Sequence, residues 1–558
     1  MTCYHDVLPV TTNMLGSNST IDSSADSCWG RSSSSQSSSD CLSVRSAFEQ
    51  ARRAATQNDT ASPGEADWKN PWHGLLYDRL RDRALPALIS EGTITPAASL
   101  WTGSRLWLRS FREANLQPGD RLLVSLSPSA AFVQVMVAAL WHGLSIALLR
   151  PGEDVTEYFD EMDATAAVSD AGLRYGVAPP DEKIPHTWWP EGLTGPADTP
   201  SALRDTTQPR SPDVRFLLRT SGTTGAPTWV ALSDRNVLSV LASHMPHLHL
   251  KNARTLSVLP WFHAFGLILD FLPALLSEAE IIRDPNGGRN PEELLRLTRA
   301  WGATHLSAVP LVIDRLRQTD GGSGMLCSLS GGIVGGAPVS GSLAQLLSGT
   351  SLRVGYGQTE ASPGIALGPP GHWAANYLGQ PLGCEISISD SGELHFRGDN
   401  ACIGVWRNGR LDRLDPDRLV ATGDRVEQDG DDLFFRGRVD NAFKLSNGRL
   451  VPAGHIESKL KQRFPALDEA FIFTPDGDNV ALALRLTDPD GERPSVDSLR
   501  TTIGDLRKRL IDVSVVAPDT WVSTPKGTVA REEMTQVMQR TFSDAPSSPS
   551  SSSASSSS

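Results

Sequence analysis

Thr220-Ser221-Gly222-Thr223-Thr224-Gly225 is a hydroxyl- and glycine-rich run that directly follows the apolar strand-like residues 216–218. The apolar residues predict a buried strand, and the run predicts a flexible loop that continues into Ala226-Pro227. Glycine lets backbone N–H groups close around an anion, and Ser and Thr hydroxyls add neutral donors. The run therefore predicts a polyphosphate loop, although it lacks the internal lysine of the common nucleotide loop. The alternative is an ordinary polar surface loop.

On both sides of this loop the chain alternates strand-like and helix-like segments. The predicted order is strand 120–126, helix 132–140 ending near Gly143, strand 145–149, then strand 255–259, helix 291–301 and strand 305–309. This βαβ rhythm predicts an α/β fold in which helices cover a mostly parallel sheet. A chain of this length needs more than one core, so we expect a large multi-subdomain domain of layered sheets and helices over residues 66–436.

The pattern changes past Gly437. Residues 470–473 and 480–486 flank a Pro-Asp-Gly turn and predict a hairpin, and residues 496–510 predict a helix. We therefore expect a small α+β domain over residues 437–542. Residues 1–65 and 543–558 are Ser-rich, with few large apolar side chains, and this composition predicts disorder.

Composition excludes several function classes. The 558 residues carry a net charge of −13, which argues against nucleic acid or an anionic membrane as the main partner. No apolar run approaches the roughly 20 residues of a membrane helix, and the first nine residues show no secretory signal. The six cysteines lack metal-site spacing and predict free thiols in a reducing compartment, so we expect a cytoplasmic location.

Four further motifs follow the loop in a fixed order. They are Gly335-Gly336-Ala337-Pro338, Tyr356-Gly357-Gln358-Thr359-Glu360, Thr422-Gly423-Asp424 and Gly437-Arg438-Val439-Asp440. We expect the second and third motifs to follow strands and the fourth to lie at the domain boundary. Each motif is weak alone, but their order and spacing together resemble the adenylate-forming (AMP-binding) superfamily. This superfamily includes acyl- and aryl-CoA ligases, peptide-synthetase adenylation domains and luciferases. The resemblance covers residues 70–540 and implies a large domain with a small mobile C-terminal domain.

The resemblance implies that the chain condenses a carboxylate with ATP, releases pyrophosphate and passes the acyl group to a thiol. It implies that residues 220–225 hold the β- and γ-phosphates, that Thr359 bonds the α-phosphate and that Glu360 holds Mg²⁺, a cation that prefers oxygen ligands. Tyr356 would offer its ring to adenine, beside Gly357 and the close-approach backbone of residues 336–338.

The resemblance also assigns the ribose site and the hinge. Asp424 would accept hydrogen bonds from the ribose hydroxyls, and Arg438 would reach ribose or phosphate. Asp440 matches the hinge about which the small domain rotates, although Asn441 stands where a second acidic residue is common. The run with Lys444, Gly448 and Pro452 is most similar to acyl-CoA synthetases. The alternatives are purely structural roles: core packing for Tyr356, a turn or helix cap for Asp424, and solvated surface charges for Glu360 and Arg438.

Two positions depart from the family pattern. The phosphate loop commonly continues Pro-Lys-Gly, whereas here Thr228 follows Pro227, so a mobile cation near the pyrophosphate is missing. The C-terminal pattern places a catalytic lysine three residues before Arg531, where Thr528 stands, and Lys526 lies two residues upstream. We predict that Lys526 is the lysine that stabilises charge on the α-phosphate and the carboxylate; a solvated loop lysine is the alternative.

The segment Pro260-Trp261-Phe262-His263-Ala264-Phe265-Gly266 corresponds to the entry of the family's acyl pocket. Amino-acid-activating members commonly carry an Asp after the first Phe, whereas this chain has His263, which favours a non-amino-acid carboxylate. A fatty or aryl acid would fit a pocket of Phe262, Phe265 and Gly266, with His263 as a gate or carboxylate-orienting residue. A satisfied core histidine is the alternative.

The sequence shows no carrier-protein signature, so the predicted acceptor is CoA or the phosphopantetheine arm of a separate protein. Two other functions stay open at this point. The lost loop lysine and the shifted Lys526 also suit a catalytically degenerate nucleotide-binding regulatory protein. Adenylation followed by ester, amide or lactone formation is the other alternative.

Overall fold

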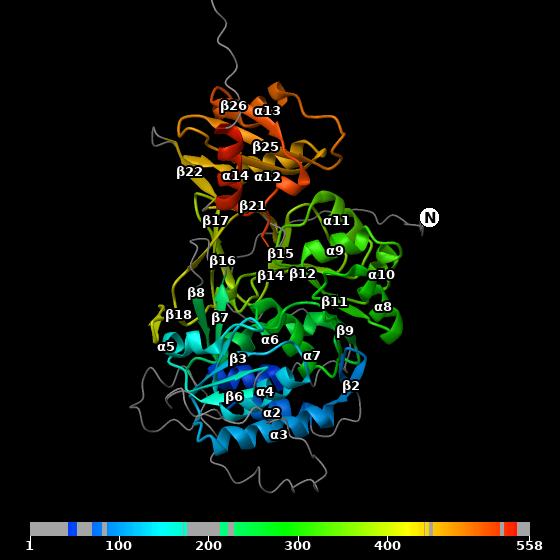
Figure 1. Cartoon of the computed structure of the whole chain (residues 1–558), viewed down its shortest axis with the longest axis vertical. Helices are drawn as coiled ribbons and strands as arrows, with labels where there is room; N and C mark the ends of the chain where they lie inside the picture. The colour runs from blue at the N-terminus through cyan, green and yellow to red at the C-terminus, as the bar shows by residue number, and fades with distance from the viewer. Residues whose placement is uncertain are drawn as a thin grey trace, which may run out of the picture.

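The computed structural model describes residues 43–52, 70–80, 86–170, 172–175, 213–220, 228–439, 441–445, 450–524 and 529–543. Of the sequence candidates, residues 221–227, Asp440, Gly448 and Lys526 lie outside these ranges. The chain forms a mixed α/β fold of several sheets, and the elements from β22 onward lie at the top of Figure 1, above the larger part. Within the described part of the chain, no helix is both long and apolar enough to cross a membrane.

The first sheet holds the predicted βαβ unit. Its strands, in spatial order, are β19 (Arg410–Arg413), β18 (Gly404–Arg407), β8 (Thr228–Leu232), β7 (Phe216–Thr220), β4 (Ser145–Leu148), β3 (Arg121–Ser125), β5 (Ala166–Ser169) and β6 (Gly172–Tyr175). β3 pairs in parallel with β4, and α4 (Ala130–His142) connects them. The Ser129 side chain accepts a hydrogen bond from the Phe132 N–H at the start of α4, and Gly143 ends it at φ +83°. The predicted strand–helix–strand unit is therefore confirmed.

The second sheet holds the other predicted cycle. Its order is β11 (His305–Ser307), β9 (Arg254–Ser257), β10 (Glu280–Arg283), β1 (Pro86–Ser90) and β2 (Thr93–Pro96). β9, β10, β11 and β1 run parallel. α8 (Pro291–Trp301) has the predicted bounds, because the Asn290 side chain accepts from the Glu293 N–H and Gly302 ends the helix in the left-handed region.

The third sheet joins the second through bridges between β11 and β12. Its order is β12 (Ile333–Gly335), β13 (Arg353–Tyr356), β14 (Ala366–Leu367), β15 (Tyr377–Pro381), β21 (Asp432–Arg438), β20 (Val420–Asp429), β17 (Glu393–Arg397) and β16 (Glu385–Ile388). β12 and β13 are parallel, whereas every other pair in this sheet is antiparallel. Parallel β9, β11, β12 and β13 thus end along one edge.

Helices cover these sheets on several faces. Those that pack around the first sheet are α2 (Trp72–Leu80), α3 (Ala97–Glu113), α4, α6 (Asp234–Leu248) and α7 (Leu272–Leu276). A second apolar cluster lies between the second sheet and α8, α9 (Pro310–Arg317), α10 (Gly322–Ser328) and α11 (Gly341–Leu347). Apolar side chains on both faces explain why the parallel strands read as continuous hydrophobic runs.

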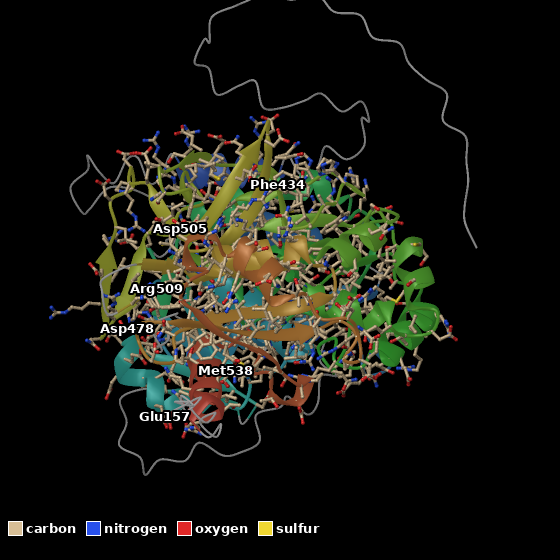
Figure 2. The ribbon with its side chains drawn as sticks, turned by 90° about the horizontal axis from the view of Figure 1, so that it is seen from above. Glu157, Phe434, Asp478, Asp505, Arg509 and Met538 are labelled. Atoms are coloured by element: carbon tan, nitrogen blue, oxygen red, sulfur yellow. The ribbon has the colours of Figure 1, made fainter. Side chains whose placement is uncertain are left out.

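The C-terminal elements form apolar clusters of their own. They comprise β22 (Ala442–Lys444), β23 (Leu450–Pro452), α12 (Ala453–Arg463), β24 (Leu467–Phe473), β25 (Val480–Leu486), α13 (Val496–Thr502), β26 (Leu510–Val515) and α14 (Arg531–Ser543). β24 and β25 pair antiparallel, so the predicted hairpin is confirmed. Figure 2 looks down on this part, where the Arg509 guanidinium donates to the Asp478 carbonyl at 2.5 Å and so ties the start of β26 to the hairpin.

Two predictions from sequence are wrong. A single helix does not span 496–510: α13 ends at Thr502, Gly504 has φ +63°, and Leu510 begins β26, which pairs in parallel with β25. Residues 43–52 were expected to be disordered but form a helix that buries Val44 and Ala47 in the first apolar cluster. In both cases packing against a distant segment overrides local composition.

Candidate active site

Two loops meet where β12 and β13 end. The strands are in register at Val334–Val354 and Gly335–Gly355, so the segments that follow them leave the sheet side by side. After β12 comes the Gly336-Ala337-Pro338 turn, largely exposed, with Gly336 at φ +86°. After β13 comes the short helix η4 (Thr359–Ala361). Crevices outside the carboxyl ends of parallel strands are the usual ligand sites of open α/β sheets.

Gly357 fixes the path of the second loop. A Cβ atom at this position would lie 1.5 Å from the Pro363 carbonyl oxygen, so any side chain would force the loop apart. The tight approach folds residues 357–363 into a compact turn that presents Thr359 and Glu360, both half-buried. η4 packs beside β7 and β8, the two strands joined by the polyphosphate loop of the sequence analysis. Thr220 and Thr228 form the last pair of that hairpin, and the Thr220 hydroxyl donates to the Thr228 carbonyl at 3.3 Å.

A cluster of three polar side chains includes Tyr356, the last residue of β13. The Tyr356 hydroxyl donates to Asp424 Oδ2 at 2.7 Å, and Arg438 Nη1 donates to Asp424 Oδ1 at 3.0 Å. Asp424 and Arg438 are opposite each other in the β20–β21 pair. Burial, and next the Asp424 charge, raise the pKa of Tyr356 well above its ordinary value, so the phenol stays protonated as a donor. Thr422–Asp424 lies inside β20, and the prediction that this motif follows a strand is wrong.

The His263 segment leaves β9 at the same edge of the combined sheet. The His263 N–H donates to the Pro260 carbonyl at 3.2 Å, and the Phe262 and His263 rings lie 4.5 Å apart. His263 is exposed, which excludes the core-histidine alternative. Gly266 is the second residue of the π-helix η3 (Phe265–Phe271). A Cβ atom at Gly266 would lie 2.2 Å from the Pro260 carbonyl oxygen. Only glycine can lie this close to the Pro260 carbonyl, which explains why a glycine follows half-buried Phe265.

The described residues that flank Lys526 on both sides make specific contacts. Ser523 and Val529 form an isolated antiparallel bridge. Beyond it, Arg531 donates to both oxygens of nearly buried Glu457, at 2.7 and 3.0 Å, and Glu457 also accepts from the Ile472 N–H at 2.8 Å. This bidentate pair fixes the start of α14. Sequence reasoning used Arg531 only as a register mark and missed Glu457, which no motif signals.

No three His, Cys, Asp or Glu side chains among the described residues gather into a group that would bind a metal ion. Glu360 is the one carboxylate of η4 and follows Thr359 directly. Of the three described cysteines, Cys384 and Cys402 have pKa values raised by burial to about 12 and about 11, so neither is a reactive thiolate.

Comparisons with known proteins agree with this geometry. The family described as AMP-binding enzyme matches residues 86–406. Feruloyl-CoA synthase of an Amycolatopsis species is 27% identical over 464 residues, which cover 76% of this chain and 90% of that enzyme. Anthranilate–CoA ligase of Pseudomonas aeruginosa is 25% identical over 390 residues, or 64% of this chain and 74% of that enzyme. The solved structure of the amide bond synthetase McbA from Marinactinospora thermotolerans superposes with a TM-score of 0.65 at 20% identity, covering 85% of this chain and 99% of McbA.

The family match spans more than half of the chain, and the solved structure shares the fold from the first sheet to the C-terminal elements. These two curated relatives are named as a CoA synthase and a CoA ligase, in agreement with the class that the order of motifs predicts. The chain therefore belongs to the AMP-binding enzyme family, and it is an acid–thiol ligase that activates a carboxylic acid as an acyl-adenylate.

Proposed function

We propose that the acid is a non-amino-acid carboxylate, either aryl or fatty, and that its acceptor is CoA or the phosphopantetheine arm of a separate carrier protein. The observation that carries this proposal is His263, exposed beside Phe262 at the crevice edge where amino-acid-activating relatives commonly have an aspartate. A substrate ammonium would find no carboxylate at this position. The relatives named for feruloyl and anthranilate support an aryl acid within this class.

We assign the nucleotide to the crevice between the two loops. Asp424 and Arg438 would take the ribose, while Tyr356 and the exposed 336–338 turn would hold adenine. The geometry favours this because Asp424 is already oriented by two donors and lies only 9% exposed, where a charge-assisted hydrogen bond is strong. Residues 220–225 would hold the β- and γ-phosphates, Thr359 the α-phosphate, and Glu360 the Mg²⁺ that neutralises phosphate charge.

The chemistry follows from these positions. A carboxylate oxygen of the acid attacks the α-phosphorus, the bond from that phosphorus to the bridging oxygen of pyrophosphate breaks, and an acyl-adenylate remains. The thiol sulfur, having lost its proton, then attacks the acyl carbonyl and AMP leaves. We assign to Lys526 the stabilisation of charge during the first step, because preorganised donors at developing charge supply the largest single catalytic effect.

We further propose that residues 437–542 act as a small mobile domain that rotates about Asp440 between the two steps. The separate apolar clusters of the C-terminal elements support an independently packed unit. α12 contacts β21 at two glycines, Gly437 and Gly454, and a Cβ atom at Gly437 would lie 2.9 Å from the Gly454 carbonyl carbon. Because this contact is made by backbone atoms, few side chains would need to move when the small domain rotates. A cytoplasmic location, where CoA and reduced thiols occur together, completes the proposal.

The product assay separates the acceptors. The enzyme is incubated with ATP, Mg²⁺ and a panel of aryl, fatty and amino acids, each with CoA or with a phosphopantetheinylated carrier, and AMP and thioester are measured by mass spectrometry. We expect AMP and thioester with one aryl or fatty class. Thioester formation with amino acids alone contradicts the substrate assignment.

Tyr356→Phe is expected to raise the KM for ATP by about 10-fold while kcat changes less than about twofold. The substitution keeps the ring but removes the hydroxyl that donates to Asp424 at 2.7 Å, and a hydrogen bond to a charged group is worth about 1.5–3 kcal/mol. Steady-state kinetics with varied ATP measure the effect. An unchanged KM contradicts the role of Tyr356 in orienting Asp424.

Thr228→Lys is expected to lower the KM for ATP by about 3- to 10-fold. The lysine restores a mobile cation at the end of the β7–β8 hairpin, where a charge-assisted bond to a phosphate oxygen becomes possible. Thr228→Gln, of similar length but neutral, is the matched control and leaves the KM unchanged. An equal effect of both substitutions contradicts an electrostatic cause.

A further inference from the structure

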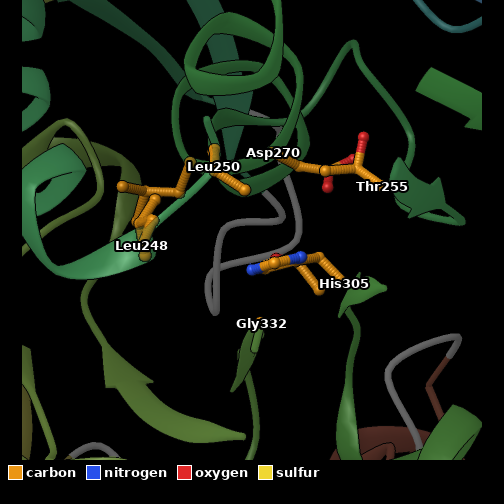
Figure 3. A pocket seen from close by; sticks show the side chains of 8 residues that line it. Leu248, Leu250, Thr255, Asp270, His305 and Gly332 are labelled. Carbon is orange, nitrogen blue, oxygen red and sulfur yellow. The ribbon is translucent and has the colours of Figure 1, made fainter. Parts of the chain in front are cut away.

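A small cavity lies between η3, the end of α6 and the strands β9 and β11. It is lined by Leu248, Leu250 and Leu269 and by the polar residues Thr255, Asp270, His305 and Ser307, with Gly332 closing it. Figure 3 shows Asp270 on one side of the cavity, His305 opposite it, and Leu248 and Leu250 flanking the space. Its volume of about 10 Å³ is enough for one water-sized group. The cavity is therefore the right size for a single terminal hydroxyl.

The Ser257 hydroxyl, whose hydrogen-bonding capacity is fully used, holds the carboxylate of Asp270 in one orientation. Ser257 Oγ accepts hydrogen bonds from Trp261 Nε1 at 3.0 Å and from Arg283 Nη1 at 3.3 Å. Both lone pairs of that hydroxyl are thus taken, and its single proton goes to Asp270 Oδ2 at 2.6 Å. The second carboxylate oxygen of Asp270 is left to the cavity as a fixed acceptor.

His305 supplies the opposite wall of the cavity. Its Nδ1 bonds the Thr304 hydroxyl at 2.9 Å, which holds the ring in place. Its Nε2 is buried and makes no hydrogen bond of normal geometry, although the Leu248 carbonyl lies near the ring; burial lowers the pKa of His305, so the ring is neutral at pH 7.5. The Thr304 hydroxyl can donate its proton to Nδ1, and the neutral His305 ring then carries its own proton on Nε2. A hydroxyl in the cavity can then donate to Asp270 and accept from His305.

The position of the cavity links it to the acid rather than to the nucleotide. Its lining includes Thr255 near the amino end of β9, both end residues of β11 and Gly332 just before β12, whereas the 336–338 turn leaves the carboxyl end of β12. The four-residue step from Gly332 to Gly336 corresponds to roughly 13 Å of strand. The π-helix that begins at Phe265 in the acyl segment carries Leu269 and Asp270 to the cavity one turn further on, and π-helical turns are frequent at functional sites.

The Asp270 carboxylate is costly to the fold. Burial raises its pKa to about 6, despite the opposing Ser257 hydrogen bond and Arg283 charge. Since the folded-state pKa lies above the unfolded value of 3.8, the stability that the protonated group contributes is lost as the pH rises through about 6. A neutral residue at position 270 would therefore make the folded protein more stable at pH 7.5. Groups that lower folding stability are typical of functional sites.

We propose that Asp270 and His305 recognise a hydroxyl at the far end of the acid, so that the substrate is a hydroxylated acid of extended shape. This inference rests on the proposed function, because it assigns the distal part of the same acyl site. Asp270 and His305 are then specificity-determining residues, remote from the reacting carboxylate. Sequence reasoning missed Asp270, although a lone acidic residue inside the apolar run 267–271 is the signal that marks it.

The test compares acids that differ only in that hydroxyl. Acid-dependent pyrophosphate exchange is measured as kcat/KM for 4-hydroxycinnamate against 4-methylcinnamate, and for 8-hydroxyoctanoate against nonanoate. We expect the wild-type enzyme to prefer the hydroxylated member of at least one pair by about 10- to 100-fold, because a site built to bond a hydroxyl leaves buried groups unpaired without it. Activation of both members of each pair at equal rates overturns the inference but leaves the proposed function intact. Activation of no acid overturns both.

Asp270→Asn supplies the residue-level test. Ser257 can only donate, so the amide oxygen must face it, and the amide NH₂ turns toward the cavity as a donor. We expect the preference for the hydroxylated acid to fall to about onefold while the Tm at pH 7.5 rises or stays level. Asp314→Asn, at a half-buried residue of α9 paired with Arg317, is the matched control and keeps the wild-type preference. A preference retained in Asp270→Asn means that the cavity holds only a structural water and overturns the inference.

Discussion

Lys526→Ala is expected to slow acid-dependent ATP–pyrophosphate exchange by about 10²- to 10³-fold. A preorganised donor at the position where phosphate charge develops is worth about this much in comparable sites. Arg531, C-terminal to Lys526, is held by Glu457 at 2.7 and 3.0 Å, and Ser523 forms a bridge with Val529. The described residues on either side of Lys526 are thus held in place by specific contacts.

The matched control is Lys508→Ala, which removes an exposed lysine from the same C-terminal part. We expect this variant to retain wild-type exchange, so that loss in Lys526→Ala reflects position rather than net charge. Circular dichroism and Tm establish that both variants are folded. An unchanged exchange rate in Lys526→Ala removes this residue from the mechanism and contradicts its assignment as the charge-stabilising lysine.

Asp424→Ala is expected to lower kcat/KM for ATP by about 10²-fold. The substitution deletes the acceptor for the ribose hydroxyls and also leaves the Tyr356 hydroxyl and the Arg438 guanidinium without their common partner. A charge-assisted hydrogen bond contributes about 1.5–3 kcal/mol, so the loss of one or two accounts for the expected factor. The effect is measured with ATP varied at saturating acid.

Two further variants define the cause. Asp424→Asn keeps the shape and one acceptor oxygen but not the charge, and we expect an intermediate loss. Glu427→Ala, on the same strand β20 and paired only across the surface with Arg436, is expected to leave kcat/KM for ATP unchanged. Equal activity of Asp424→Ala and wild type contradicts the ribose assignment.

Local signals in the sequence predict much of the fold. The apolar run 216–218, the Ser129 and Gly143 limits of α4 and the Asn290 and Gly302 limits of α8 each combine a periodic pattern with a capping residue. The 496–510 segment failed because Gly504 breaks the helix and the last residues pair with β25, a contact that no local pattern encodes. The helix at 43–52 was missed because its two buried apolar residues are diluted in a Ser-rich background.

The candidate site was predictable as a set of motifs but not as a network. Motif order places Tyr356, Asp424 and Arg438 in one site, whereas the hydrogen bonds among them depend on the pairing of β20 with β21 and on the position of β13 in the same sheet. The Ser257–Asp270 contact joins a strand end to a π-helix that periodicity does not reveal. Such contacts follow from the assembled sheets rather than from any one segment.

Acid-dependent exchange of labelled pyrophosphate into ATP tests the central claim most directly, because it requires the crevice to bind nucleotide and acid together and to form the acyl-adenylate. We predict exchange that depends on Mg²⁺ and on an aryl or fatty acid, and that stays at background with amino acids. Tight binding of ATP without exchange for any acid in the panel would contradict the account.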